Sequence, residues 1–328
     1  MSQLKKLKAI FTSDALNGLF ILSPKRLKQK GTGFLALLAL GIVSIIWGTT
    51  WVVSKQGVMA MPALEMAGIR QIIGGSCYLI FYLFKRDNFP KFSDILPLLV
   101  LSILNFVLSN GLSTWGVKYI SSGLASIIGA IFPLWIVIIG IITTKIKPPG
   151  TALFGIILGF IGICTIFYNH LADFINPDFR FGIFVSFLAT WSWAFGTIYT
   201  KSHAKKFNPY FGLGIQMMFS GIILFFISSF DAHYLPLLDI PKVSWFAILY
   251  LVLFGSIIAF VCYLYALQHL PTEQTSIYAY INPIVALFTG WLVLGESLST
   301  TIIIGCVITV SGVYLVNRTF IMNHLNNK

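Results

Sequence analysis

Three ionisable side chains lie inside or at the edge of long apolar stretches, where a charge is costly. Arg70 lies within residues 63–84, Glu65 precedes it on the same stretch, and Glu273 opens residues 273–294. A charge in apolar surroundings is unfavourable unless it has a hydrogen-bonding partner or contact with water. Arg70 therefore fits either a structural lock between helices or a group that binds or couples to a solute. Glu65 and Glu273 are the candidates for carrying a proton.

Aromatic and hydrogen-bonding side chains recur at helical spacing in other apolar stretches, which places them on shared helix faces. Such stripes fit hydrogen bonding between helices, or the lining of a polar cavity. We favour a cavity for a neutral or zwitterionic solute with an apolar part, because rings supply contact area while amides and hydroxyls orient the solute. The predicted substrate-binding residues are Trp47, Trp51, Asn105, Ser109, Trp193, Thr197, Tyr263, Tyr278 and Asn282.

The sequence lacks the motifs of several other chemistries. It contains no GxxxxGK[ST] loop for ATP phosphates, no HExxH segment and no close carboxylate pair within an apolar stretch. Neither the four cysteines nor the five histidines have the spacing of metal ligands. We therefore predict no metal, no cofactor and no catalytic residue, and we do not expect an enzyme.

The amino-acid composition indicates whether these side chains belong to a soluble or a membrane protein. Of 328 residues, 57% are hydrophobic and only 10% are charged, against about 25% charged residues in an average soluble domain. So little charge cannot cover a surface that faces water, and the chain is therefore an integral membrane protein. The net charge of +12 fits lipid head groups and membrane topology better than a nucleic-acid partner.

Ten apolar stretches have the length that a helix needs to cross the hydrocarbon core, which is about 20 residues. They are continuous rather than alternating, and backbone groups in lipid must be hydrogen-bonded internally, so helices are expected. The predicted fold class is an all-α integral membrane protein with ten transmembrane helices. These occupy residues 34–54, 63–84, 94–117, 121–143, 151–168, 181–200, 209–230, 244–267, 273–294 and 301–317.

Basic residues in the connections set the orientation. Seventeen lysines and arginines fall on the side that carries both termini, and four fall on the other side. Positive charge is enriched in the cytoplasm, so we expect a multi-pass protein of the cell membrane with both termini cytoplasmic. Residues 1–33 would form a basic N-terminal tail and residues 318–328 a C-terminal tail. Trp51, close to the end of its stretch, also suits the aromatic belt at the membrane surface.

The chain repeats itself, and residues 34–168 and 181–317 are predicted to be two copies of a five-helix unit. An odd number of helices makes the second copy enter the membrane from the opposite face, which is typical of secondary transporters. An offset of 146 residues aligns Trp47 with Trp193 and sets Arg70 opposite Gln216. An offset of 150 residues aligns Pro133 with Pro283, Gly155 with Gly305, and Gly162 with Gly312.

Pro133 and Pro283 each lie in the middle of an expected helix. A proline there removes one backbone donor and frees the carbonyl four residues earlier. Each bend is either a static kink or one of a pair of hinges about which two symmetry-related helices flex.

Several segments together resemble a known family. They are WGTTWVVSK at residues 47–55, the intramembrane arginine of MAGIRQIIGG, the two prolines, and AYINPIVALFTGWLVLGESLS followed by GCVITVSGVYLV. These resemble the EamA branch of the drug/metabolite transporter superfamily over about residues 34–317. The first copy departs from the pattern, with Thr144-Lys145 where the second has Gly295-Glu296.

The resemblance implies a ten-helix inverted-repeat carrier, usually an exporter of small metabolites, amino acids or drugs. We accordingly expect a secondary-active exporter that works by alternating access around a cavity at the membrane midplane. Its partners would be a small solute, membrane lipid and a proton as a coupling ion, in a monomer or a homodimer. The alternatives are a sugar-phosphate or nucleotide-sugar carrier, for which one arginine is poor provision, and a membrane-embedded lipid-modifying enzyme.

Overall fold

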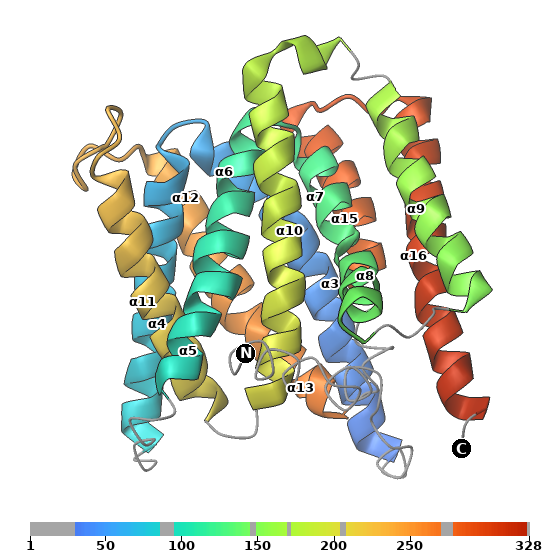
Figure 1. Cartoon of the computed structure of the whole chain (residues 1–328). Coiled ribbons are helices and arrows are strands. Elements are labelled where there is room, and N and C mark those ends of the chain that lie inside the picture. Colours follow the sequence, from blue (N-terminus) through green and yellow to red (C-terminus); the bar gives the residue numbers. More distant parts are fainter. Residues whose placement is uncertain are drawn as a thin grey trace, which may run out of the picture.

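The computed structural model describes residues 30–85, 95–144, 149–168, 172–203, 208–269 and 278–326, all of it helices and short connections (Figure 1). The first half contains α3 (Lys30–Val58), α4 (Ala63–Lys85), α5 (Ile95–Leu101), η3 (Ser102–Gly111), α6 (Leu112–Tyr119), α7 (Ser122–Ala130), α8 (Phe132–Thr144) and α9 (Gly150–Tyr168). The second half contains η4 (Asp173–Ile175), α10 (Pro177–His203), α11 (Pro209–Ser228), α12 (Lys242–Tyr250), η6 (Leu251–Ile258), α13 (Ala259–His269), α15 (Tyr278–Leu294) and α16 (Thr300–Asn326).

Seven described segments are long and apolar enough to cross a membrane. They are Phe34–Val58, Ala63–Phe84, Ile95–Tyr119, Gly150–Tyr168, Pro177–Thr200, Pro209–Ser228 and Lys242–Tyr263. Three shorter apolar helices, Ser122–Ile136, Ile281–Leu294 and Thr300–Val316, coincide with the remaining predicted stretches. The expected all-helical, multi-pass architecture is therefore present.

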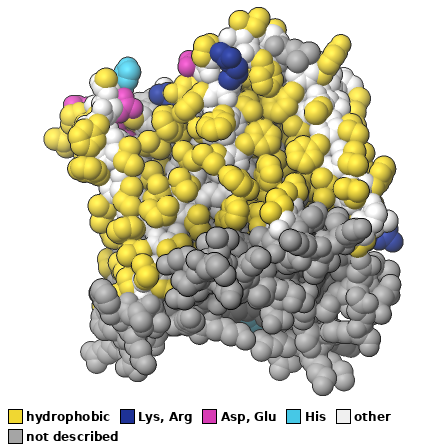
Figure 2. All heavy atoms as spheres, in the orientation of Figure 1, with side chains coloured by type: hydrophobic (Ala, Val, Ile, Leu, Met, Phe, Trp, Pro, Cys, Tyr) yellow, Lys and Arg dark blue, Asp and Glu magenta, His cyan; other side chains and the backbone are white. Residues whose placement is uncertain are grey.

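The outer surface explains why the chain needs lipid. Hydrophobic side chains cover most of the described surface visible in Figure 2, and charged side chains gather toward its margins. Phe84, Phe154 and Phe246 are among the large apolar residues that are more than half exposed. A monomer in water rarely exposes so large a contiguous apolar area, whereas hydrocarbon solvates it well.

Helices of the two halves pack against each other rather than forming separate bundles. Helix α4 packs along α11, α9 packs along α16, and α3 contacts both α13 and α15, while α10 contacts η3, α6 and α8. Glycines permit the closest of these approaches. A Cβ atom on Gly162 would lie 2.8 Å from the carbonyl oxygen of Gly305, and one on Gly312 would lie 2.6 Å from that of Gly155.

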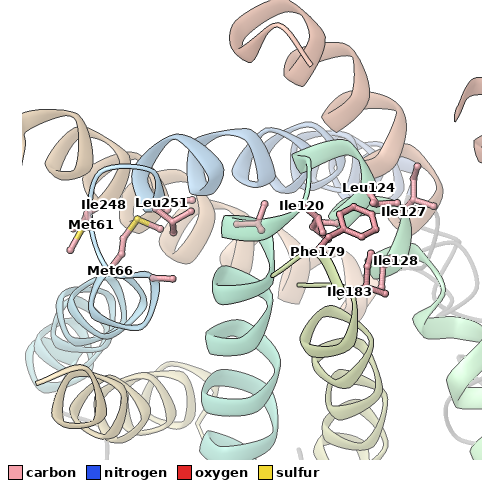
Figure 3. Close-up of a cluster of buried hydrophobic side chains, with 14 of the residues drawn as sticks. Met61, Met66, Ile120, Leu124, Ile127, Ile128, Phe179, Ile183, Ile248 and Leu251 are labelled. Carbon is pink, nitrogen blue, oxygen red and sulfur yellow. The ribbon is translucent and has the colours of Figure 1, made fainter. Parts of the chain in front are cut away.

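Apolar side chains fill the end of the bundle where α3 meets α4 and α6 meets α7 (Figure 3). Met66 from α4 and Ile248 and Leu251 from α12 and η6 lie on one side of this cluster. Leu124 and Ile128 from α7 lie on the other side, and all five are at most 4% exposed. These side chains belong to one cluster of buried apolar residues at this end of the bundle.

Two opposite charges hold the connection between α6 and α7 at the same end. Lys55 Nζ donates hydrogen bonds to the carbonyl oxygens of Lys118 (2.9 Å) and Ile120 (3.0 Å), at the carboxyl end of α6. Glu296 Oε1 accepts from the Ser122 amide (2.7 Å), and its Oε2 accepts from Ser122 Oγ (2.9 Å) and the Gly123 amide (3.2 Å). Each charge has the sign that stabilises its helix end. We call this arrangement the α6–α7 clamp.

The segment 121–143 differs from the single bent helix expected around Pro133. It consists of two helices, α7 and α8, which are separated at Ile131, whose amide bonds the carbonyl of Ile128 (3.3 Å). Pro133 is the second residue of α8, where an amide donor is not needed. In one continuous helix the pyrrolidine ring would clash with the carbonyl of Gly129, so the helix ends before the proline and α8 begins anew. Pro283, in contrast, lies inside the continuous helix α15.

Candidate functional site

A central cavity of about 170 Å³ lies between the two halves of the chain. Its walls come from α3, α4, η3, α6, α7 and α8 of the first half and from α10, α13 and α15 of the second half. The volume is slightly larger than the ~150 Å³ that holds one benzene molecule in an engineered cavity. A compact solute of about one ring and a few further atoms matches this space.

Seven of the nine predicted binding residues lie in the cavity lining, whereas two do not. The Thr197 hydroxyl donates to the carbonyl of Trp193 in its own helix (2.8 Å), and Tyr263 packs behind the lining. The seven residues in the lining are Trp47, Trp51, Asn105, Ser109, Trp193, Tyr278 and Asn282.

An aromatic cluster forms one wall of the cavity. The ring of Trp47 lies 5.0 Å from Tyr278, 5.2 Å from Tyr263 and 5.3 Å from Phe260, measured between centroids. Tyr278 is stacked on Phe132 at 6.1 Å, with 14° between the ring planes. The Trp47 indole donates a hydrogen bond to the carbonyl of Gly255 (3.2 Å). Rings held in this way present a fixed apolar surface to a solute.

The facing wall is polar and lies on η3 and α6. Asn105 is 8% exposed, its Nδ2 lies 3.5 Å from the Thr200 hydroxyl, and its Oδ1 has no hydrogen-bond partner. Asn110, further along, accepts a hydrogen bond at Oδ1 from Gln71 Nε2 (3.1 Å). This wall supplies amide and hydroxyl groups without a formal charge.

Sequence reasoning missed three polar residues of this wall, Asn110, Ser113 and Thr114, which lie in the lining beside Ser109. Residues 102–111 form a π-helix, whose wider turn moves side chains out of the α-helical register. The α-helical spacing therefore selected Ser109 and passed over its neighbours. The polar run SNGLST at residues 109–114 was the available signal.

Asn282 links the cavity to the first helix. With its amide nitrogen turned toward two acceptors, Asn282 donates to the carbonyl oxygens of Ser44 (2.9 Å) and Tyr278 (3.0 Å). The bond to Ser44 joins α15 to α3 one residue before Pro283, and the bond to Tyr278 lies within α15. Asn282 therefore contributes to the helix contact as well as to the lining.

The two described charged candidates, Arg70 and Glu65, have different hydrogen-bond partners. Arg70 lies in the lining, is 7% exposed, and donates from Nε to Ser256 Oγ (3.1 Å). Glu65 lies outside the lining, where its Oε2 accepts from the Leu235 amide (3.2 Å) and its Oε1 has no partner. Glu273 is outside the described residues. No group of three metal-ligating side chains occurs in the described part of the chain.

Comparison with known proteins places this geometry in a family. The sequence model of the EamA-like transporter family matches the chain twice, at residues 33–168 and 180–318. The chain belongs to this family. The resemblance found in the sequence is thereby confirmed, and the protein is a multi-pass membrane transporter of the drug/metabolite type.

Individual relatives of this EamA-like transporter agree with the assignment. YedA of Escherichia coli strain K12, named an uncharacterized inner membrane transporter, is 32% identical over 80% of this chain and 83% of its own length. YoaV of Bacillus subtilis, named an uncharacterized transporter, is 24% identical over 86% of this chain and 97% of its own length. A crystal structure that matches 88% of this chain and 98% of its own, with a TM-score of 0.60 and 14% identity, shares the fold.

Proposed function

We propose that this transporter is a secondary-active exporter that moves a small solute through the central cavity by alternating access. Ten membrane-spanning helices would form two inverted five-helix units, residues 34–168 and 181–317, flanked by cytoplasmic tails at residues 1–33 and 318–328. Support comes from the family model, which matches each half separately. In Figure 1, moreover, α3 begins at the lower end of the bundle and α10 begins at the upper end.

The observation that carries this proposal is the composition of the cavity walls. Both halves contribute to the lining, so a movement of one half against the other would change the access to the cavity. An aromatic wall faces an amide and hydroxyl wall, which suits a solute with an apolar part and a polar part. A solute would contact Trp47 and Trp193 through its apolar part and Asn105 and Ser109 through its polar part.

Hinge motion and coupling form the second part of the proposal. Pro283 leaves the carbonyl of Ala279 without its usual helical donor, and Ala279 lies in the lining. We propose that α15 bends there as the cavity changes sides, whereas the turn before Pro133 joins two rigid helices and does not flex. Glu65 is the described candidate for proton coupling. Unchanged gradient-driven uptake by Glu65→Gln and Glu273→Gln variants would exclude these carboxylates as proton carriers.

The experiment is a thermal-shift screen of a solute panel on the purified protein, followed by exchange of each hit in proteoliposomes. A ligand at about 100 times its Kd stabilises the protein by about 2.7 kcal/mol. Trp47→Ala and Asn282→Ala should both lose this stabilisation and the exchange. Trp191→Ala, which removes a 44% exposed ring from α10, and Asn176→Ala, in an exposed connection, serve as matched controls.

Each result of this experiment bears on the proposal. Loss of binding in both cavity variants, with both controls intact, locates the solute in the cavity. Persistence of binding and exchange in both cavity variants would place the transport route elsewhere and contradict the proposal. Lipid turnover by the purified protein without solute exchange would support a lipid-modifying enzyme instead.

A further inference from the structure

Among the described residues that line the cavity, Arg70 is the only charged one. No described carboxylate lies within 4 Å of its guanidinium, and the nearest candidate along the helix, Glu65, bonds the Leu235 amide instead. A guanidinium does not lose its proton under physiological conditions, so this charge is permanent. An unpaired buried charge is expensive. The cavity thus carries one positive charge that nothing in the described protein balances.

The guanidinium belongs to the cavity lining and keeps donors that no described residue uses. Nε donates to Ser256 Oγ (3.1 Å), and no described residue accepts a hydrogen bond from either Nη atom. The two Nη groups form the planar fork that binds both oxygens of a carboxylate side by side. Ser256 occupies the third side of the guanidinium and holds this fork in place.

Gly255 brings the guanidinium next to the aromatic wall. A Cβ atom on Gly255 would lie 3.1 Å from an Arg70 Nη atom and 3.0 Å from a methyl carbon of Thr50. The carbonyl oxygen of the same glycine accepts the hydrogen bond of the Trp47 indole (3.2 Å). Arg70 and Trp47 therefore meet at one residue of η6. An anionic group and a ring separated by one or two atoms could contact both at once.

We propose that the transported solute is a small monocarboxylate with an apolar or aromatic body, and that Arg70 binds its carboxylate while Trp47 and Tyr278 contact the body. This inference rests on the proposed function and adds the chemical class of the solute. One guanidinium balances one negative charge, which favours a carboxylate over a doubly charged phosphate. The cavity of about 170 Å³ limits the body to about one ring.

The test uses phenylacetate and phenylacetamide, which share size and shape but differ in charge. Their apparent Kd values are measured from the concentration dependence of the melting temperature of the full-length protein in detergent. Wild type should bind phenylacetate about 10- to 100-fold more tightly than the amide, which is the range for hydrogen bonds to a charged group. The ratio within one variant cancels any general change in stability, so a purely structural role for Arg70 would not alter it.

Three variants separate the charge from its position. Arg70→Gln should reduce the ratio to about one, and Arg70→Lys should retain part of it, because an ammonium keeps the charge but not the planar fork. Gly255→Ala keeps the guanidinium but adds a methyl carbon 3.1 Å from one of its Nη atoms, which shifts the fork and should lower the ratio to a smaller extent. Lys242→Gln removes an exposed cation far from the lining and should leave the ratio unchanged.

The results that would contradict the monocarboxylate assignment differ from those that would contradict the proposed transport function. Equal binding of the two probes by wild type, binding of neither, or a preference that survives both Arg70→Gln and Gly255→Ala would overturn the monocarboxylate assignment. If proteoliposomes still exchange other solutes in a Trp47-dependent way, the transport proposal stands and only the solute class is wrong. If no solute is exchanged, the proposed function itself fails.

Discussion

The two halves of the chain are each matched by the same family model, yet they differ in the chemistry they bring to the cavity. Gly162 and Gly312 take equivalent places in α9 and α16, and each brings a backbone carbonyl of the facing helix into contact range. Arg70 and Gln216, aligned by the repeat, do not match. Arg70 lines the cavity, whereas the Gln216 amide nitrogen donates to the carbonyl of Gly212 in its own helix (2.9 Å). These matched glycines therefore hold helices together, and the unmatched Arg70 sets the charge of the described lining.

The two prolines show the same contrast within one pair of helices. Pro133 follows a break at Ile131 and removes no helical hydrogen bond, because it lies in the first turn of α8. Pro283 lies inside α15 and removes one. Prolines at aligned sequence positions thus lie in different structures. Pro133 follows a turn between two helices, α7 and α8, whereas Pro283 lies in one continuous helix, α15, that lacks one hydrogen bond. This difference predicts unequal functional roles.

The largest expected effect concerns the shared scaffold. Gly162→Val and Gly312→Val should each destabilise the protein by about 1–3 kcal/mol or prevent folding, because the added atoms meet backbone of the facing helix that cannot move aside. The two effects should be of similar size if the halves are equivalent. Thermal melting in detergent measures them. Gly41→Val, where a Cβ has no neighbour within 4 Å, is the control and should melt as wild type does.

The second effect concerns Glu296 of the α6–α7 clamp, which the first copy does not match, since it has Thr144-Lys145 where the second has Gly295-Glu296. Glu296→Ala removes three hydrogen bonds at the amino end of α7 and should lower the free energy of unfolding by about 2 kcal/mol. Asp239→Ala, in an exposed connection, should change it little. Chemical denaturation of the two variants in matched detergent gives the comparison. Equal stability of Glu296→Ala and wild type would show that the clamp contributes nothing.

The third effect separates the two prolines. Pro283→Ala restores a helical hydrogen bond and should slow solute exchange several-fold with little change in solute affinity, whereas Pro133→Ala should alter neither. Exchange rates and Kd values for one solute in proteoliposomes supply the test. If both variants exchange at the wild-type rate, α15 does not act as a hinge.

The smallest effect concerns Gln216, the uncharged residue that the 146-residue offset aligns with Arg70. Gln216→Ala should lose some stability, since its amide hydrogen bond is buried, but should keep the wild-type ratio of phenylacetate to phenylacetamide binding. A changed ratio would mean that Gln216 reaches the solute, and that the two halves share the charge recognition which we assign to Arg70.

The sequence predicted the helices and seven residues of the lining because both follow simple periodicities. Apolar length identified the helices, and spacing of four residues identified Trp47, Trp51 and Asn105. This spacing does not apply where the backbone leaves the α-helical register. The π-helix at residues 102–111 therefore explains why Asn110 and Thr114 were not predicted to line the cavity. Helical spacing also does not predict contacts between segments that are far apart in the sequence. Nothing local indicates that Glu296 lies against Ser122, because that contact depends on how α15 packs beside α7.

Labelling of a single cysteine in the cavity tests most directly whether the two halves enclose a solute pathway. In a variant with the four native cysteines replaced by alanine, Ser109→Cys places one thiol in the lining. A membrane-impermeant thiol reagent should modify it when added to either face of the membrane, and a bound solute should slow the reaction. Reaction from neither face, or from one face only whether or not solute is present, would contradict alternating access through this cavity.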